Sequence, residues 1–480
     1  MWLILWEAFH YQNFVRIEMN QPADQFAARY GLQLNPAWQA WFNEDCRSVP
    51  LPASFTAPLP VGDLLDEAPS QIWPGFMLPD TLPLVSNLYG DWICVRVEAQ
   101  DGLGELLHWY HGGGDWIPVG QHLSEMVVHD VVDQFRPLAR QMLRGAPESM
   151  QPARAGELMA QFHQPRLQQW LVEYLPRRPA EDSQSGLLPT VAAEFESQTG
   201  TAGRLQRLAE LLEQSAYDAV LAALWRWRWA EDAVACDLIQ HALQPTPPRL
   251  ADAEIARQAG IDWSPDYVRW LFDLDQVPQE LRGRLLELAG EDPSAWPQQD
   301  WPLAGHIASQ VLQRRNNLGW AVNVAGWSSQ RQGQVEQAAE IYFSGRFASA
   351  FSDQGVRMRS HWNQPQRGKF TVAQLLGLDE YLTDQQRGDG YLSAIRRSPP
   401  PQTRAAVQQW WLEKAAAQLD QAAPAEAYES FYRAGWDMGV QRLGDYLPIL
   451  EGMVVAAEAA GWPARAAVAQ THLNCLRARL

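Results

Sequence analysis

The stretch from residue 84 to residue 130 constrains the fold most, because short apolar runs alternate in it with glycine-containing turns. The runs cover residues 92–97, 106–110 and 116–119, and the turns fall at 100–104 and 112–114. β-Branched and aromatic runs separated by Asp-Gly and Gly-Gly are typical of antiparallel hairpins. Apolar residues spaced for one face of a helix follow at Leu123, Met126, Val127 and Val131. The stretch therefore predicts an antiparallel sheet with one face packed on helices.

The segment before the hairpins predicts two helices and a proline-rich connection. Residues 22–45 have helical spacing that is interrupted between Gly31 and Pro36. Residues 46–83 are expected to form loops and short edge strands, because proline cannot donate to a central ladder. The prolines of this connection are Pro50, Pro52, Pro58, Pro60, Pro69, Pro74, Pro79 and Pro83.

The order of these features resembles that of a known family. Gly90 and Asp91 precede the first strand, and an acidic glycine turn follows it. The second strand ends near Trp109, and an aromatic-Ile-Pro strand then leads to a helix that begins near Ser124 and Glu125. The upstream helices add matching markers at Phe26, Tyr30, Gly31, Leu32, Leu34, Pro36, Trp38 and Trp41.

Over residues 20–135 the chain resembles the SUKH superfamily, which groups fungal regulators of cell-wall glucan synthesis with bacterial immunity proteins against polymorphic toxins. The resemblance implies an α+β fold and a protein partner. Its motifs are markers of shape, and they include no invariant catalytic set.

Residues beyond Thr190 predict helices, because apolar positions step by three and four with charges between them. One window has the small and aromatic residues of a tetratricopeptide helix pair, namely Gly326, Gly333, Ala338, Tyr342 and Gly345. Val322 and Ser329 depart from that pattern, and only a weak echo follows near Gly461 and Ala466. This region therefore predicts a helical-repeat-like domain.

The expected fold is an α+β N-terminal domain, a mostly antiparallel sheet with flanking helices, followed by an all-α domain. The expected divisions are an extension at 1–19, a SUKH-like domain at 20–145, a helix and linker at 146–189, and a tetratricopeptide-like domain at 190–480. A chain of 480 residues is long enough for two to four domains.

The charge balance of 38 basic and 56 acidic residues gives a net charge of −18. Nucleic-acid binding and adsorption to an anionic membrane both need a basic surface, so this balance argues against both. It suits a basic protein partner, and it suits simple solubility equally well. The four cysteines are far apart with no CxxC spacing, which favours a reducing cytoplasm over a disulfide framework or zinc site.

Several patterns could indicate chemistry, but each lacks a required part. The turn from His111 to Gly114 resembles an esterase oxyanion turn, yet no G-x-S-x-G nucleophile elbow accompanies it. Gly368-Lys369 resembles the end of a phosphate loop, but Asn363 stands where glycine is required. A metal site could draw on His108, His111, His122, His129 and Asp115, although residues 108 and 111 point to opposite faces of a continuous strand.

The sequence therefore predicts a protein without catalysis, cofactor or metal that acts by binding another protein. The first hypothesis is an immunity protein that neutralises a basic toxin domain. The alternative is a regulatory scaffold that acts through its helical half, and a hydrolase whose site assembles only in the fold is the outsider. The predicted contact residues are Gly90, Asp91, Trp92, Trp109, His111, Asp115 and Trp116. Aromatic residues flanked by charge are common at interface hot spots, but these tryptophans could instead fill the core.

Overall fold

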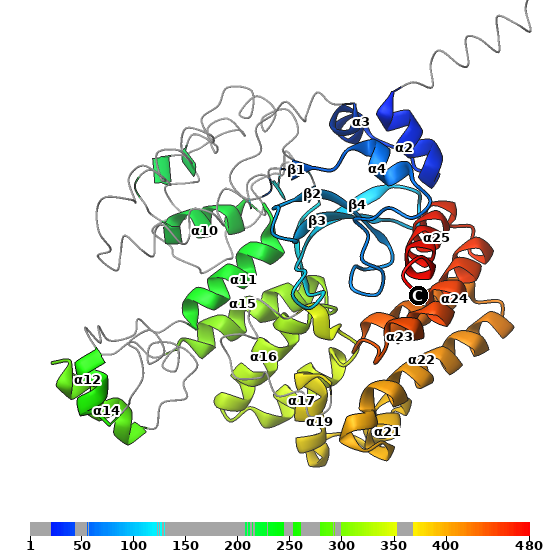
Figure 1. The fold of residues 1–480 in the computed structure, drawn as a ribbon. Coiled ribbons are helices and arrows are strands. Elements are labelled where there is room, and N and C mark those ends of the chain that lie inside the picture. The colour runs from blue at the N-terminus through cyan, green and yellow to red at the C-terminus, as the bar shows by residue number, and fades with distance from the viewer. Residues whose placement is uncertain are drawn as a thin grey trace, which may run out of the picture. The chain divides into compact units, whose positions relative to one another are not determined.

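The structure is a computed structural model of the chain. It describes most residues of the N-terminal sheet region and of the C-terminal helical region. The described residues are 21–43, 55, 57–121, 123, 125, 126, 129, 207, 208, 210, 211, 214, 217–227, 229–243, 253–260, 279–290, 292, 299–352 and 368–480. They confirm the expected fold class, an N-terminal antiparallel sheet with helices followed by a mostly helical region (Figure 1). None of the helices in these ranges is long and apolar enough to cross a membrane.

Contacts divide the chain into two compact units. Unit 1 comprises residues 1–234, 411–436 and 440–480, and unit 2 comprises residues 235–410 and 437–439. The last part of the chain thus belongs to the same unit as the N-terminal sheet. The linker expected at 146–189 lies outside the described residues.

The sheet of unit 1 is a five-stranded antiparallel meander in the order β1-β2-β3-β4-β5. Its strands are β1 Ala57–Pro58, β2 Thr81–Ser86, β3 Trp92–Val97, β4 Leu103–Trp109 and β5 Trp116–Gly120. The three predicted apolar runs correspond to β3, β4 and β5. The β2–β3 loop and the β4–β5 turn lie at the same end of the sheet, because each connects an antiparallel pair there.

The N-terminal helices are α2 Pro22–Tyr30, α3 Pro36–Phe42 and α4 Val61–Leu65. Helix α2 ends at Gly31, whose φ of 66° is the left-handed conformation that favours glycine after a helix. Helix α3 begins at Pro36 after Asn35, whose side chain accepts from the Trp38 N–H at 3.0 Å. The interrupted helical pattern at 31–36 is thus a true break between two capped helices.

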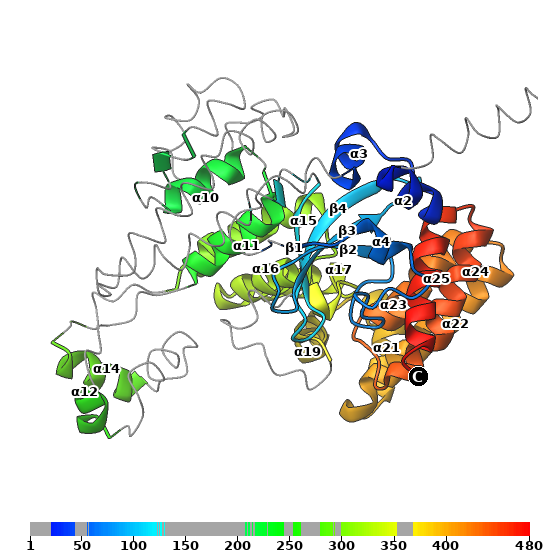
Figure 2. The same ribbon diagram turned by 45° about the horizontal axis from the view of Figure 1, so that its top comes forward.

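The C-terminal helices of unit 1 pack on this N-terminal part. They are α23 Pro424–Trp436, α24 Leu447–Ala459 and α25 Pro463–Arg477, and α25 lies beside α2 in both ribbon views (Figures 1 and 2). Trp436 Nε1 donates to the Met77 carbonyl oxygen at 3.1 Å, and Arg465 Nε donates to that of Val97 at 3.2 Å. The sheet and helices more than 300 residues away in sequence therefore share one core.

His472 lies at the centre of the contact between α25 and the sheet. Its ring is completely buried, Nε2 lies 3.0 Å from the Thr81 carbonyl oxygen, and Nδ1 has no hydrogen-bond partner. Burial lowers the pKa of His472 to about 4, against the opposing effects of the Thr81 carbonyl and the Asp80 carboxylate; the Arg479 charge also lowers it. The imidazole is thus held neutral in the folded protein.

We expect this histidine to make unfolding pH-dependent. The folded protein takes up the proton less readily than the unfolded chain, whose histidine titrates near pH 6.5, so stability is full above that pH and falls as the pH drops toward 4. At about pH 5 the loss relative to neutral pH is about 2 kcal/mol. Urea unfolding at both pH values measures it, with His472→Gln as the control that donates but does not titrate. Equal pH dependence in the two proteins contradicts the prediction.

Unit 2 is a set of packed helices. The described helices include α11 Glu231–Ala242, which begins in unit 1, and α12 Ala253–Gln258, α14 Gln279–Leu288, α15 Trp301–Arg314, α16 Gly319–Arg331, α17 Val335–Ser344, α19 Phe370–Gly377, α20 Asp384–Arg387 and α21 Gly390–Arg397. The other described helices of the chain are α10 Tyr217–Arg226 and α22 Thr403–Asp420.

Helices α16 and α17 form the hairpin that the tetratricopeptide-like window predicts. A Cβ at Gly326 would lie 2.2 Å from the Tyr342 ring, and one at Gly345 would lie 2.3 Å from Val322. Gly333 makes the turn with a φ of 76°. The small residues therefore stand where the two helices touch. A second hairpin, α24 with α25, turns at Gly461 with a φ of 71°.

Candidate protein-binding surface

Among the described residues that precede β3, two loops of unit 1 each expose a pair of large apolar side chains. Trp73 and Phe76, in the connection before β2, are 51% and 49% exposed. Leu88 and Tyr89, in the β2–β3 loop, are 74% and 84% exposed. Exposed apolar residues are common singly, but pairs gathered in neighbouring loops mark interaction sites.

Hydrogen bonds fix the β2–β3 loop tightly although its tip is apolar. Asn87 Oδ1 accepts from the N–H groups of Tyr89 at 2.9 Å and Asp91 at 3.1 Å, and Asn87 Nδ2 donates to Asp91 Oδ2 at 3.0 Å. Ser86 Oγ accepts from the Leu88 N–H at 3.0 Å. Short polar side chains that bond nearby backbone groups are typical of such turns. The loop is thus preorganised, which reduces the entropy lost when a partner binds.

Leu88 has an unfavourable backbone conformation. Its φ is 64°, in the left-handed region where a leucine costs about 1–2 kcal/mol relative to the right-handed one. Asn and Gly tolerate this region, and neither occupies the position. Since the Leu88 side chain is mostly exposed, packing does not offset this cost. Strain retained at an exposed residue favours a functional role.

Replacing Leu88 by asparagine is therefore expected to stabilise the protein. Leu88→Asn relieves the backbone strain and removes little buried surface, so the free energy of unfolding should rise by about 0.5–1 kcal/mol. Chemical denaturation measures the change. A matched control is Ala422→Asn, because Ala422 is also exposed and has a φ of 54°. A lower stability for Leu88→Asn shows that the side chain has a structural role.

The β4–β5 turn joins the two loops. Asp91 Oδ1 accepts from the His111 N–H at 3.0 Å and lies 2.7 Å from His111 Nδ1. Trp109 Nε1 donates to the Phe76 carbonyl oxygen at 3.0 Å, and a Cβ at Gly114 would lie 2.9 Å from the same oxygen. We call Trp73, Phe76, Leu88, Tyr89 and the half-exposed His111 the loop-end surface.

Asp91 is the polar centre beneath this surface. Burial raises the pKa of its carboxyl, but the nearby His108 ring and the hydrogen bonds from His111 outweigh burial and hold the pKa well below its usual range. The carboxylate is therefore ionised across the physiological range. Its hydrogen bond from the His111 N–H connects the β4–β5 turn to the β2–β3 loop.

The predicted contact residues fall into two groups. Gly90, Asp91 and His111 lie in the loops described above. Trp92, Trp109 and Trp116 form one row across β3, β4 and β5. Trp92 is partly exposed, whereas Trp109, Trp116 and also Asp115 are buried. The alternative that the tryptophans fill the core thus applies to Trp109 and Trp116, which are 2% and 4% exposed.

The exposed residues of the surface were not among the predicted ones. Trp73, Phe76, Leu88 and Tyr89 show no periodicity, since loops have none. The available signal was local: Ser86 and Asn87 favour a fixed turn, and a bulky apolar pair follows them directly.

No metal site forms among the described histidines and carboxylates. His108 stacks on Tyr110 with ring centroids 3.9 Å apart and meets Phe55 edge-on at 4.9 Å. His111 Nδ1 lies 2.7 Å from Asp91 Oδ1, and His108 Nε2 lies 4.0 Å from the other oxygen of the same carboxylate. The turn from His111 to Gly114 closes a hairpin, as the missing nucleophile elbow indicated.

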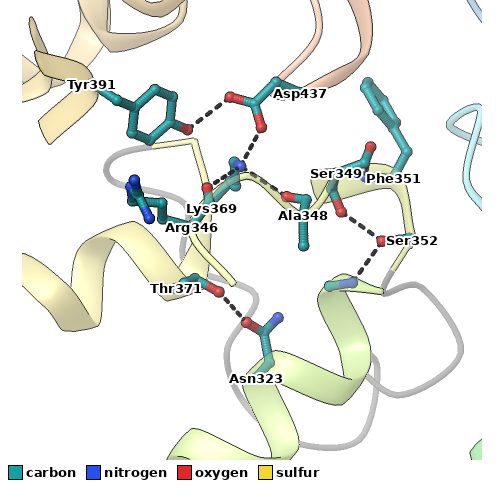
Figure 3. Close-up of polar contacts among 11 residues, drawn as sticks. Asn323, Arg346, Ala348, Ser349, Phe351, Ser352, Lys369, Thr371, Tyr391 and Asp437 are labelled. Carbon is teal, nitrogen blue, oxygen red and sulfur yellow. Dashed lines mark hydrogen bonds and ion pairs between the residues drawn. The ribbon is translucent and has the colours of Figure 1, made fainter. Parts of the chain in front are cut away.

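Unit 2 contains a buried polar cluster that could suggest acid–base chemistry. Lys369, Tyr391 and Asp437 are joined by an ion pair and a hydrogen bond (Figure 3). Nearby, Thr371 Oγ1 donates to Asn323 Oδ1 at 2.6 Å and connects α19 with α16. The ammonium group and both carboxylate oxygens already bond within the protein, which favours a structural role over a reacting one.

Comparisons with protein-family models, with curated proteins and with solved structures find no match to this chain.

Proposed function

We propose that this chain is a non-catalytic protein-binding protein that holds its partner through the loop-end surface of unit 1. The observation that carries the proposal is the exposed pair Leu88 and Tyr89, held in a strained loop whose Leu88 and Tyr89 N–H groups are hydrogen-bonded. A large apolar residue in a fixed, exposed position supplies binding energy with little loss of conformational freedom.

The partner we propose is a basic toxin domain, which makes the chain an immunity protein of the kind its SUKH-like pattern implies. Charge supports this choice. The segment from 48 to 95, which contains both exposed loops, has no Lys or Arg. Its acidic residues are Asp63, Asp66, Glu67, Asp80 and Asp91, of which Asp80 is buried and pairs with Arg96. An acidic region beside apolar anchors favours association with a basic surface and speeds the encounter.

Tyr89→Ser tests the proposal with a basic toxin domain that the wild-type chain binds as the partner. Loss of an aromatic anchor costs about 2 kcal/mol, so the dissociation constant should rise about 30-fold. The matched control is Tyr381→Ser, because Tyr381 is an exposed tyrosine of unit 2. The Tyr381→Ser variant should bind the toxin domain with the wild-type affinity. Calorimetric titration measures both, and thermal unfolding confirms that each variant is folded.

Two results contradict the proposal. Equal affinities for wild type and folded Tyr89→Ser remove Tyr89 from the binding surface. Loss of affinity in Tyr381→Ser but not in Tyr89→Ser assigns binding to the helical half, as the scaffold hypothesis expects.

A further inference from the structure

A three-residue segment of the chain belongs to unit 2 although the residues on both sides of it belong to unit 1. Residues 411–436 and 440–480 are part of unit 1, whereas residues 437–439 are part of unit 2. Asp437 and Met438 are almost completely buried. The segment, Asp437-Met438-Gly439, thus lies in unit 2 as a bound peptide lies in a receptor.

Unit 2 binds the polar atoms of this segment from three elements, and Figure 3 shows the contacts of two of them, through Lys369 and Tyr391. Asp437 Oδ1 accepts from Lys369 Nζ, and Oδ2 accepts from the Tyr391 hydroxyl at 2.7 Å. The Asp437 carbonyl oxygen accepts from the Ala350 N–H at 2.9 Å. Side chain and backbone are therefore both recognised, as in sites that bind peptides by one acidic residue.

The cation of this site is fixed independently of the carboxylate. Lys369 Nζ also donates to the carbonyl oxygens of Arg346 and Ala348, each at 2.8 Å, and lies 5.5 Å from the centre of the Tyr391 ring. These contacts remain when the carboxylate is removed. The ammonium group is thus preorganised to bind an anion.

The apolar part of the site is shaped for the next two residues. A Cβ at Gly368 would lie 2.7 Å from Met438 Sδ, so only glycine leaves room for that side chain. Gly439 has a φ of 76°, and a Cβ there would lie 2.9 Å from the Phe351 ring. Close approach on both sides indicates a fitted segment.

We propose that unit 2 contains a carboxylate-binding site for a short acidic peptide segment, and that the chain's own Asp437–Gly439 occupies it as a latch. The ligand class is an aspartate in a bent segment with a glycine two positions later, because Asp437 and Met438 form a bend and Gly439 has a positive φ. The latch releases while the helices of unit 2 stay folded, because Lys369 keeps its two carbonyl partners.

The experiment removes the carboxylate and supplies another one in solution. In the full-length Asp437→Ala variant, hydrogen exchange should accelerate at the Ala350 amide, whose acceptor belongs to the segment, while the amides of α16 and α17 keep their protection. Formate at about 100 mM should restore protection at Ala350 and raise Tm, because a ligand that binds only the folded state stabilises it. Chloride at equal ionic strength should not.

The control is Lys369→Met/Asp437→Ala, in which formate should have no effect because its cation is absent. If Asp437→Ala is unfolded in buffer, formate-dependent refolding supports the site. Three results overturn the proposal. In the first two, Asp437→Ala does not respond to formate, or the double variant responds equally. In the third, exchange accelerates across α16 and α17 together with Ala350, which shows that the Asp437–Gly439 segment is an ordinary part of the core.

Discussion

A chain that ends at Gly461, and so lacks α25, is expected to lose the folded sheet of unit 1. Helix α25 contributes a nearly continuous buried face to the unit, including Val468, Leu473 and Leu476. Burial of each such aliphatic side chain contributes about 1.5–3 kcal/mol. The three together contribute about 5 kcal/mol or more, which is comparable with the total stability of a domain.

Hydrogen bonds make the loss larger. Three hydrogen bonds run from α25 and the residues after it to backbone carbonyl oxygens before and within β2, and the deletion removes all three. They join His472 to Thr81, Cys475 Sγ to the Pro69 carbonyl oxygen at 3.3 Å, and Arg479 Nη2 to the Ser70 carbonyl oxygen at 3.0 Å. Each such hydrogen bond contributes about 0.5–1.5 kcal/mol to the stability of the folded unit.

Amide hydrogen exchange at β3 and β4 measures this result. In the shortened chain these amides should exchange as fast as those of an unfolded peptide. Removal of Leu480 alone is the control and should leave the amides protected, because that residue is exposed. Protected amides in the shortened chain contradict the account, since they make residues 20–145 an independent domain.

The second large loss of stability is expected from the substitution Lys369→Met. This change removes the ammonium group but leaves the Asp437 carboxylate buried in unit 2. An uncompensated buried charge destabilises a protein by about 3–5 kcal/mol. Chemical denaturation followed by a probe in unit 2 should show a loss of this size in the free energy of unfolding.

The matched control for Lys369→Met removes both charges. In Lys369→Met/Asp437→Leu no unpaired charge remains, so the double variant should be more stable than Lys369→Met alone. A double variant as unstable as the sum of both single changes refutes the assignment of the loss to the buried charge.

The local part of the fold could be predicted from sequence. The run at 92–97 is β3, and the runs at 106–110 and 116–119 match β4 and β5 to within a few residues. Residues 46–83 were expected to form loops and short edge strands because of their prolines, but β2 begins at Thr81 and lies inside the sheet. All six residues of β2 are buried, and Pro83 lies at a register shift. Period-two alternation disappears when both faces of a strand are covered.

The packing of α23 to α25 on the sheet could not be predicted in this way. Trp436 meets Met77 and His472 meets Thr81 across more than 350 residues, and helical periodicity shows only that a face is buried, not against what. The same limit applies to the binding surface. Trp109 and Trp116 have the composition of an interface, yet the register of β4 and β5 turns them into the core.

The affinity of Leu88→Asn for the proposed toxin partner is the most direct test of the proposal that the strained, exposed loop forms the binding surface. We expect Leu88→Asn to be more stable than wild type and to bind the partner at least about 10-fold more weakly. Ala422→Asn should gain stability without losing affinity. A Leu88→Asn variant that binds as tightly as wild type contradicts the claim.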